Sequence, residues 1–186
     1  MTTSYFLAGV MQGARRAVDA ADQSYRPALR ALIHRHDPGA VVHDPHELVL
    51  ARHGGGQRAA RDRLAALAGP RTLVRAELDR PTRQLLELFH EMARLAAASD
   101  VCVAWLPGDE PSMGTAAEMY AAYAAERTVV AITPMRHNVA VLACSTVIVP
   151  DLDAFSVWLS PHAAGERSPY PPRSQPEEPN PKGAQP

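Results

Sequence analysis

The stretch from Gly108 to Glu126 contains the residue with the most chemical potential, Glu118. It follows a nearly continuous apolar run, and parallel α/β proteins place their ligands at the carboxyl ends of such strands. A carboxylate there can act as a nucleophile on a substrate. The motif Thr115-x-x-Glu118 also matches a helix capping box, in which the acid only accepts hydrogen bonds from backbone N–H groups. The residues alone leave both roles open for Glu118.

Two other segments follow predicted strands and carry candidate ligand contacts. The first, GVMQGAR, is not G-x-G-x-x-G, so the dinucleotide fingerprint is absent. Its glycines still allow a ligand to approach the backbone closely, with a plain glycine turn as the alternative. The second is Pro107–Glu118, in which Ser112-x-Gly114 precedes a helix start that suits an anion. The acidity of this loop argues against a polyphosphate and favours a sugar. The candidate ligand-binding residues are Gly9, Met11, Gly13 and Arg15 in the first segment and Ser112 and Gly114 in the second.

Histidines gather in the segment HRHDPGAVVHDPHE. The spacing of His34, His36, His43 and His46 does not match a tight tetrahedral zinc set, and no cysteine accompanies them. We therefore expect locally bonded or solvated histidines and no metal site. Asp44 follows the second predicted strand and remains a candidate for ligand contact.

The elements that must position these residues alternate between strand and helix. Five short apolar runs predict strands, and two of them, VCVAW and TVVAI, are continuous, as in a sheet covered on both faces. Residues at helical spacing predict helices between them. The predicted strands are Tyr5–Val10, Ala40–His43, Val101–Leu106, Thr128–Thr133 and Thr146–Val149, and the predicted helices are Asp22–His36, Gln57–Ala68, Thr82–Ala98, Thr115–Glu126 and Asp151–Leu159. This alternation predicts a parallel α/β sheet.

The segment between His46 and Asp79 has no clear pattern outside its predicted helix, and Arg71–Ala76 is either a minor strand or part of a lid. Eight of the chain's 17 prolines lie from Ser160 onward, without apolar periodicity. We therefore expect one α/β domain over residues 1–159 and a disordered tail over residues 160–186.

Composition excludes several classes of protein. The formal net charge of the 186-residue chain is −1, which gives no general basic surface for nucleic acid. No apolar run reaches ~18 residues, so no membrane span is expected. The N-terminus is not a convincing signal peptide, and Cys102 and Cys144 are expected as buried thiols. These features predict a soluble cytoplasmic protein.

Three segments together resemble the nucleoside 2-deoxyribosyltransferase family and the related nucleoside 5′-monophosphate N-glycosidases. The residues are Tyr5-Phe6-x-Ala8-Gly9, then SDVCVAWLP before the central motif, and Ser112-x-Gly114-x-x-x-Glu118 followed by Ala121 and Tyr123. The resemblance covers roughly residues 4–159 and is weak in the middle. It implies a Rossmann-like three-layer fold, with a mainly parallel five-stranded sheet and helices on both faces.

The resemblance also implies a chemistry. It makes Glu118 the nucleophile on the anomeric carbon of a nucleoside or nucleotide, with water or a second base as acceptor and no cofactor. Tyr5 is expected either in the core or as a hydrogen-bond donor to the Glu118 carboxylate. The family's aspartate is replaced here by Met92. Either Glu91, one place earlier, is the general acid, or the acid lies elsewhere in the chain. Ser112 stands where the monophosphate hydrolases bind phosphate, but Val10 and Gln12 replace other phosphate-binding residues.

Two further implications concern partners and alternatives. The family commonly completes its site with a neighbouring subunit, so a dimer-based homo-oligomer is expected, with the helices Thr82–Ala98 and Thr115–Glu126 between subunits. A catalytically silent nucleotide-binding or sensing module on the same fold is the alternative function. A resemblance to cytokinin-activating phosphoribohydrolases is weaker, since PSM replaces the expected PGG before Gly114-Thr115.

Overall fold

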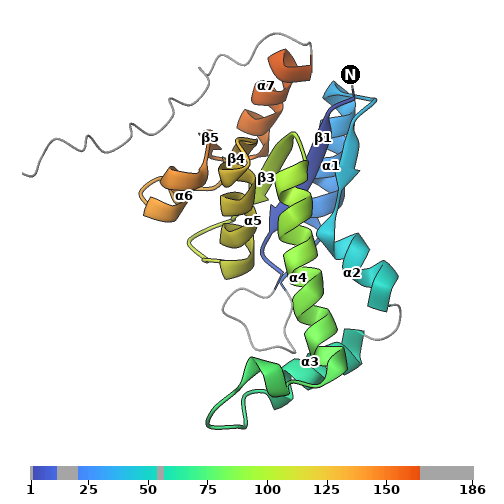
Figure 1. The fold of residues 1–186 in the computed structure, drawn as a ribbon. Helices are drawn as coiled ribbons and strands as arrows, with labels where there is room; N and C mark the ends of the chain where they lie inside the picture. The colour runs from blue at the N-terminus through green and yellow to red at the C-terminus, as the bar shows by residue number, and fades with distance from the viewer. Residues whose placement is uncertain (1, 12–20, 54–56, 164–186) are drawn as a thin grey trace, which may run out of the picture.

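A five-stranded parallel sheet organises the chain. The computed structural model describes residues 2–11, 21–53 and 57–163. The strands are β1 (Ser4–Gly9), β2 (Val41–His43), β3 (Val101–Trp105), β4 (Thr128–Ile132) and β5 (Val147–Val149). They pair in the order β2-β1-β3-β4-β5, and every pair is parallel (Figure 1). The predicted five-stranded parallel sheet is confirmed.

Helices cover both faces of the sheet, which gives three layers. One face carries α4 (Arg80–Ala98), α5 (Met113–Ala124) and α6 (Val139–Cys144), with α2 (Pro45–His53) packed against its margin. The other face carries α1 (Tyr25–His36) and α7 (Leu152–Ala163). The helix α3 (Gln57–Ala66) lies away from the sheet and contacts α4 (Figure 1). The predicted fold class, with helices on both faces, is therefore confirmed.

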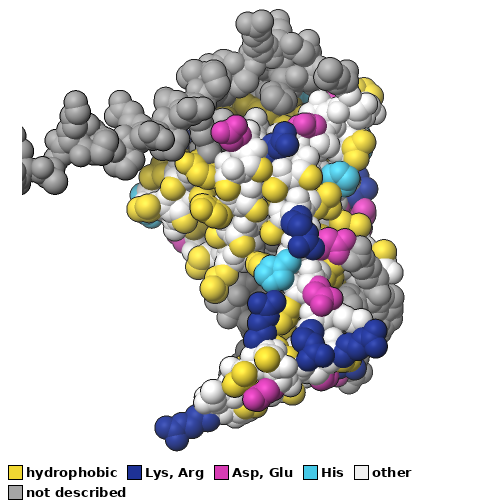
Figure 2. Space-filling view, in the orientation of Figure 1, with side chains coloured by type: hydrophobic (Ala, Val, Ile, Leu, Met, Phe, Trp, Pro, Cys, Tyr) yellow, Lys and Arg dark blue, Asp and Glu magenta, His cyan; other side chains and the backbone are white. Residues whose placement is uncertain are grey.

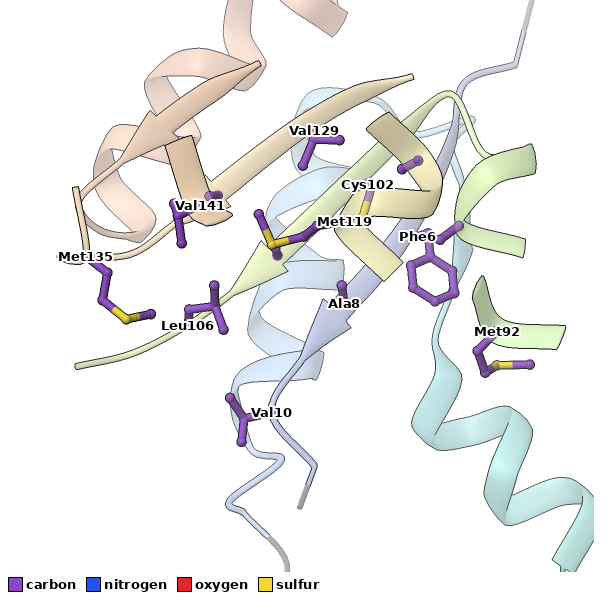
Figure 3. Close-up of a cluster of buried hydrophobic side chains, with 14 of the residues drawn as sticks. Phe6, Ala8, Val10, Met92, Cys102, Leu106, Met119, Val129, Met135 and Val141 are labelled. Atoms are coloured by element: carbon purple, nitrogen blue, oxygen red, sulfur yellow. The ribbon is translucent and has the colours of Figure 1, made fainter. Parts of the chain in front are cut away.

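The face under α4 and α5 is built from small residues where the helices come closest. Ala8, Ala104 and Ala131 stand in register across β1, β3 and β4 and are buried. Their small side chains leave room for Met119 of α5 and Met92 of α4, which lie over the strands (Figure 3). On the outer side of this helix layer, charged side chains gather over α4 and apolar ones over α5 and α6 (Figure 2).

The structure adds elements that the sequence pattern did not indicate. α2 and α6 were not predicted, and the segment Arg71–Ala76 forms no strand; a 3₁₀ helix lies at Arg75–Glu77. The predicted domain boundary at Ser160 falls within α7, which continues to Ala163. The remainder of the predicted tail lies outside the described residues. Within the described part of the chain, no helix is both long enough and apolar enough to span a bilayer.

Candidate active site

The start of α5 tests one of the two roles that the sequence leaves open for Glu118, the capping role. The helix begins at Met113, and its N-cap is Ser112, whose hydroxyl accepts a hydrogen bond from the backbone N–H of Thr115 at 3.3 Å. The helix therefore starts earlier than predicted, and Thr115 lies in its first turn. Glu118 is then one turn too far along the helix to complete a capping box. The capping interpretation is wrong, because Ser112 satisfies the helix start.

Glu118 instead points into the protein from the second turn of α5. Its side chain is 5% exposed, and it is the only charged residue of the helix. Burial raises the pKa of Glu118 to about 8, while the nearby guanidinium of Arg26 acts to lower it. Desolvation disfavours the charged form of a carboxyl group, so Glu118 holds a proton at neutral pH. A buried carboxyl with a shifted pKa is a frequent mark of a functional site.

Arg26 and Asp44 form a buried ion pair beside this carboxyl. Arg26 is 2% exposed, and its Nη1 donates to Asp44 Oδ1 and to the carbonyl of Leu7, both at 2.9 Å. Its Nε donates to Gln23 Oε1 at 2.7 Å. Among the described residues, Arg26 Nη2 has no hydrogen-bond partner. Asp44, predicted to contact a ligand, is thus committed to Arg26, and it also accepts from the N–H of His46.

An aromatic pair lies at the carboxyl ends of β1 and β3. Tyr25 stacks on Trp105 with ring centroids 5.6 Å apart, and the Arg26 guanidinium carbon lies 5.2 Å from the centre of the Tyr25 ring. A Cβ atom on Gly9 would lie 2.1 Å from Tyr25 Oη, so a larger residue at the end of β1 would force the Tyr25 ring to shift. The predicted close approach at Gly9 is therefore made by a side chain of the protein itself.

Tyr25 Oη is buried and has no hydrogen-bond partner among the described residues. Burial raises the pKa of Tyr25 to about 12; Arg26 lowers it, and the charges of Asp44 and Glu118 raise it further. The charge of Arg26 lowers the pKa of Glu118, and the charge of Glu118 raises that of Tyr25, so these three side chains lie close enough to interact electrostatically. A cleft of about 410 Å³ opens beside Arg26 and Asp44, between α1 and the start of α2.

Tyr5 lies on the other face of the sheet from α5. Alternation along β1 places Tyr5 with Leu7 in the core beneath α1 and α7, whereas Phe6 and Ala8 lie in the core beneath α4 and α5. Among the described residues, Tyr5 Oη has no hydrogen-bond partner, and burial raises its pKa to about 12. The expected hydrogen bond from Tyr5 to Glu118 is therefore not formed. The core position, the other expectation for Tyr5, is the one observed.

The remaining predicted site residues are spread along this edge. Met11 is half-buried after β1, and its carbonyl accepts from the N–H of Ala21 at 2.8 Å. Gly114 lies in the first turn of α5, near Phe89 of α4. Glu91 is half-buried on α4, which packs beside α5. Gly13 and Arg15 lie outside the described residues.

The sequence analysis missed Tyr25, Arg26 and Trp105 as site residues. The burial of Arg26 could have been predicted from its spacing. It precedes Leu29 and Ile33 by three and seven positions and so lies on the same buried face of the helix. A charged residue on an apolar stripe is an indication of a buried ion pair. Trp105 ends a predicted strand at its carboxyl end, the edge where ligands bind.

The histidine-rich segment forms no evident metal site. In the described part of the chain, no three or more His, Cys, Asp or Glu side chains are grouped so that they could hold a metal ion. His36 instead bonds across the helices of one layer, with its Nε2 2.9 Å from Ser156 Oγ of α7. This contact ties α1 to α7 and is structural.

Comparisons with known proteins give a likeness of fold. No family model and no curated protein matches the sequence. A solved structure of a 2-deoxyribosyltransferase from Bacillus psychrosaccharolyticus is similar, with 13% identity, a TM-score of 0.49, and coverage of 83% of this chain and 90% of that one. A conserved protein from Enterococcus faecalis V583 is similar with 21% identity, a TM-score of 0.41, and coverage of 86% and 87%. At these identities and TM-scores, an activity has to be argued from the site residues.

Proposed function

We propose that the chain cleaves or exchanges the N-glycosidic bond of a nucleoside or nucleoside 5′-monophosphate, with Glu118 as the nucleophile. One observation carries the proposal: Glu118 is a buried carboxyl on the helix that follows β3, at the edge where parallel α/β sheets bind ligands. It does not cap this helix, because Ser112 is the N-cap. A charged side chain is rarely buried without a partner or a function. The motif that contains Glu118 supplies the substrate class, through its resemblance to the central motif of the nucleoside 2-deoxyribosyltransferases.

The reaction follows from the carboxylate. An ionised Glu118 oxygen bonds to the anomeric carbon as the C–N bond breaks, and the bonding electron pair leaves with the base. The carboxylate also stabilises the oxocarbenium-like transition state. A proton from a general acid reaches the departing base, because a nucleobase anion is a poor leaving group. Water or a second base then attacks the same carbon and frees Glu118.

Arg26 and Tyr25 have distinct roles in this proposal. The Arg26 guanidinium favours the ionised carboxylate against the effect of burial. Its ion pair with Asp44, 2.9 Å between Arg26 Nη1 and Asp44 Oδ1, holds the guanidinium in place. Tyr25 and Trp105 place aromatic rings at the same edge, and nucleobases stack on such rings.

The general acid and the phosphate contact remain predictions. Glu91 is the proposed acid, and it lies on α4, the helix that packs against α5. Ser112 is the proposed contact for the sugar or its phosphate. Its oxygen already accepts from the N–H of Thr115 and from Thr115 Oγ1, at 3.3 and 2.9 Å, so its proton is available to a ligand oxygen.

The test is a substrate panel. The purified chain is incubated with the common ribo- and 2′-deoxyribonucleosides and their 5′-monophosphates, each with and without a second free base, and released base is separated by chromatography. We expect release from at least one member, abolished by Glu118→Gln. Tyr5→Phe serves as the matched control, because Tyr5 lies in the core of the other face. Absence of base release across the whole panel would reject the proposal.

A second function, a non-catalytic nucleotide-binding module, has one observation in its favour. A Glu118 pKa of about 8 leaves the carboxyl mostly neutral at pH 7. A neutral carboxyl can donate a hydrogen bond to a ligand, but it is a poor nucleophile. Calorimetric binding of a nucleotide without turnover, unchanged in Glu118→Gln, would support this alternative.

A further inference from the structure

Two buried polar atoms near Glu118 have no hydrogen-bond partner among the described residues. They are Tyr25 Oη and Arg26 Nη2. Arg26 is 2% exposed, so bulk water does not replace the missing partner. Buried polar groups are nearly always hydrogen-bonded, and each exception in a folded protein needs an explanation. At the ligand-binding edge of a parallel sheet, a bound molecule that supplies the missing acceptor is such an explanation.

The two atoms lie next to each other. Burial raises the pKa of Tyr25 to about 12, whereas Arg26 lowers it through its charge and a polar contact that lacks the geometry of a hydrogen bond. The rest of the guanidinium is fixed, because Nη1 donates to Leu7 and Asp44 and Nε donates to Gln23. Nη2 is therefore held in one position. Arg26 also lines the cleft of about 410 Å³, so a small molecule in this cleft lies beside it.

The chemistry of the two atoms defines the group that they bind. A guanidinium N–H only donates hydrogen bonds, and a phenol whose pKa is raised to about 12 keeps a proton to donate at neutral pH. The ligand must therefore present an acceptor. Asp44 already pairs with the charge of Arg26, so an anion finds no unpaired positive charge here. A hydroxyl group fits best, since it is uncharged and accepts two hydrogen bonds.

The neighbouring Glu118 indicates which hydroxyl this is. In the proposed function, on which this inference rests, Glu118 attacks the anomeric carbon on the face of the sugar opposite the base. The 2′-hydroxyl of a ribonucleoside lies on that same face, on the carbon next to the reacting one. We propose that Tyr25 Oη and Arg26 Nη2 donate hydrogen bonds to the 2′-hydroxyl of the substrate, so that the sugar is ribose and not 2-deoxyribose.

A site of this kind discriminates between the two sugars. Bound 2-deoxyribose leaves both donors unpaired, and sites built to bind a substrate hydroxyl reject the analogue that lacks it for this reason. Intrinsic reactivity favours the other sugar, because the 2′-hydroxyl withdraws electrons from the oxocarbenium-like transition state. A preference for ribose therefore has to come from the protein. It is also the opposite of the preference that the name of the 2-deoxyribosyltransferases suggests.

The experiment compares sugars that differ at one hydroxyl. Adenine, guanine, cytosine and uracil are each supplied on ribose, 2-deoxyribose, arabinose and 3-deoxyribose, as nucleosides and as 5′-monophosphates. With the same base, kcat/KM for base release should be at least ~10-fold higher for ribose than for 2-deoxyribose. Arabinose has its 2′-hydroxyl on the other face and should behave like 2-deoxyribose. Removal of the 3′-hydroxyl should lower kcat/KM less than removal of the 2′-hydroxyl.

Two tyrosine variants test whether the preference comes from these donors. Tyr25→Phe removes one donor and keeps the ring that stacks on Trp105, and it should reduce the preference for ribose at least ~5-fold. It should not lower the melting temperature, because no described residue hydrogen-bonds the hydroxyl. Tyr5→Phe is the matched control, since Tyr5 Oη is also buried and without a partner among the described residues, but lies in the core of the other face. This variant should keep the preference of the wild type.

Three results would overturn the inference: no preference for ribose in the wild type, an unchanged preference in folded Tyr25→Phe, or an equal loss in Tyr5→Phe. Failure of the proposed function is distinguishable, because then no base is released from any of the sugars. Equilibrium dialysis of the same nucleosides and monophosphates then tests the recognition of the sugar alone. Tighter binding of the ribose compounds that is lost in Tyr25→Phe would support the inference, and equal or absent binding would overturn it.

Discussion

Helices α4 and α5 pack side by side on the same face of the sheet, yet they distribute polarity in opposite ways. α4 is an ordinary amphipathic helix, with Leu88, Met92 and Ala96 buried and with charged or polar residues at most of its exposed positions. α5 has its single charge, Glu118, buried, and its exposed positions are all apolar. Polar residues normally face solvent and apolar residues face the core. α4 follows this pattern, whereas α5, in the same layer, buries its one charged residue and exposes apolar ones.

The residue pattern of α4 is the one that stabilises a folded chain, whereas that of α5 requires an explanation from function. The buried side of α4 is explained by its amphipathic pattern. Its start is explained by Asp79, whose side chain caps the helix by accepting from the N–H of Thr82 at 2.9 Å. Neither the buried acid nor the exposed apolar side chains of α5 stabilise an isolated chain. Conflicts between local pattern and environment are expected at functional sites. We therefore propose a chemical role for the inner side of α5, where Glu118 is buried.

A pair of methionines tests the contrast most strongly. Met92 on α4 is 4% exposed, and Met92→Ala should cost about 2–5 kcal/mol of unfolding free energy through the lost contacts and the cavity. Met113 on α5 is almost fully exposed, so Met113→Ala should change the stability of the monomer by less than about 0.5 kcal/mol. Urea denaturation at dilute protein concentration measures both. Similar losses for the two variants would contradict the assigned exposures.

The buried acid gives a pH-dependent effect of comparable size. Because the pKa of Glu118 is raised to about 8, the folded state holds its proton more tightly than the unfolded state, and stability falls as pH rises from about 4.5 through 8. Glu118→Gln lacks this loss. It should match the wild type near pH 4.5 and exceed it by about 2–4 kcal/mol near pH 8.5. Denaturation across this range is the measurement, and a constant difference would argue against a raised pKa.

The helix start provides a smaller effect that distinguishes two caps. Ser112→Ala removes the side chain that accepts from Thr115 N–H and should cost about 1 kcal/mol. Glu118→Met removes the side-chain oxygens, and at pH 4.5 it should show no comparable loss, because Glu118 caps nothing. The reverse result would return Glu118 to the capping role.

The smallest effect is expected on the charged side of α4. Glu87 is exposed there, and Glu87→Ala should alter the unfolding free energy by less than about 0.5 kcal/mol. A larger loss of unfolding free energy would contradict the exposed position of Glu87.

Much of the fold was predictable because continuous apolar runs such as VCVAW and TVVAI leave few alternatives to buried parallel strands. The geometry of the candidate site was harder to predict from the sequence. Period-two alternation shows that Tyr5 and Phe6 face opposite layers, but not which layer carries α5. The helix start was misplaced because Ser112 and Thr115 are both acceptable N-caps, and only the backbone path selects Ser112. α6 escaped prediction because six residues contain too little of a helical period.

Whether Glu118 reacts with substrate is tested most directly by the pH-rate profile. On one accepted substrate, kcat/KM for base release should rise with pH, pass its midpoint near pH 8 and level off above that pH, because only the ionised carboxylate attacks the sugar. Glu118→Gln should lower the rate by at least ~10³-fold across the range while remaining folded. Base release by Glu118→Gln at a rate close to that of the wild type would contradict a nucleophilic role for Glu118.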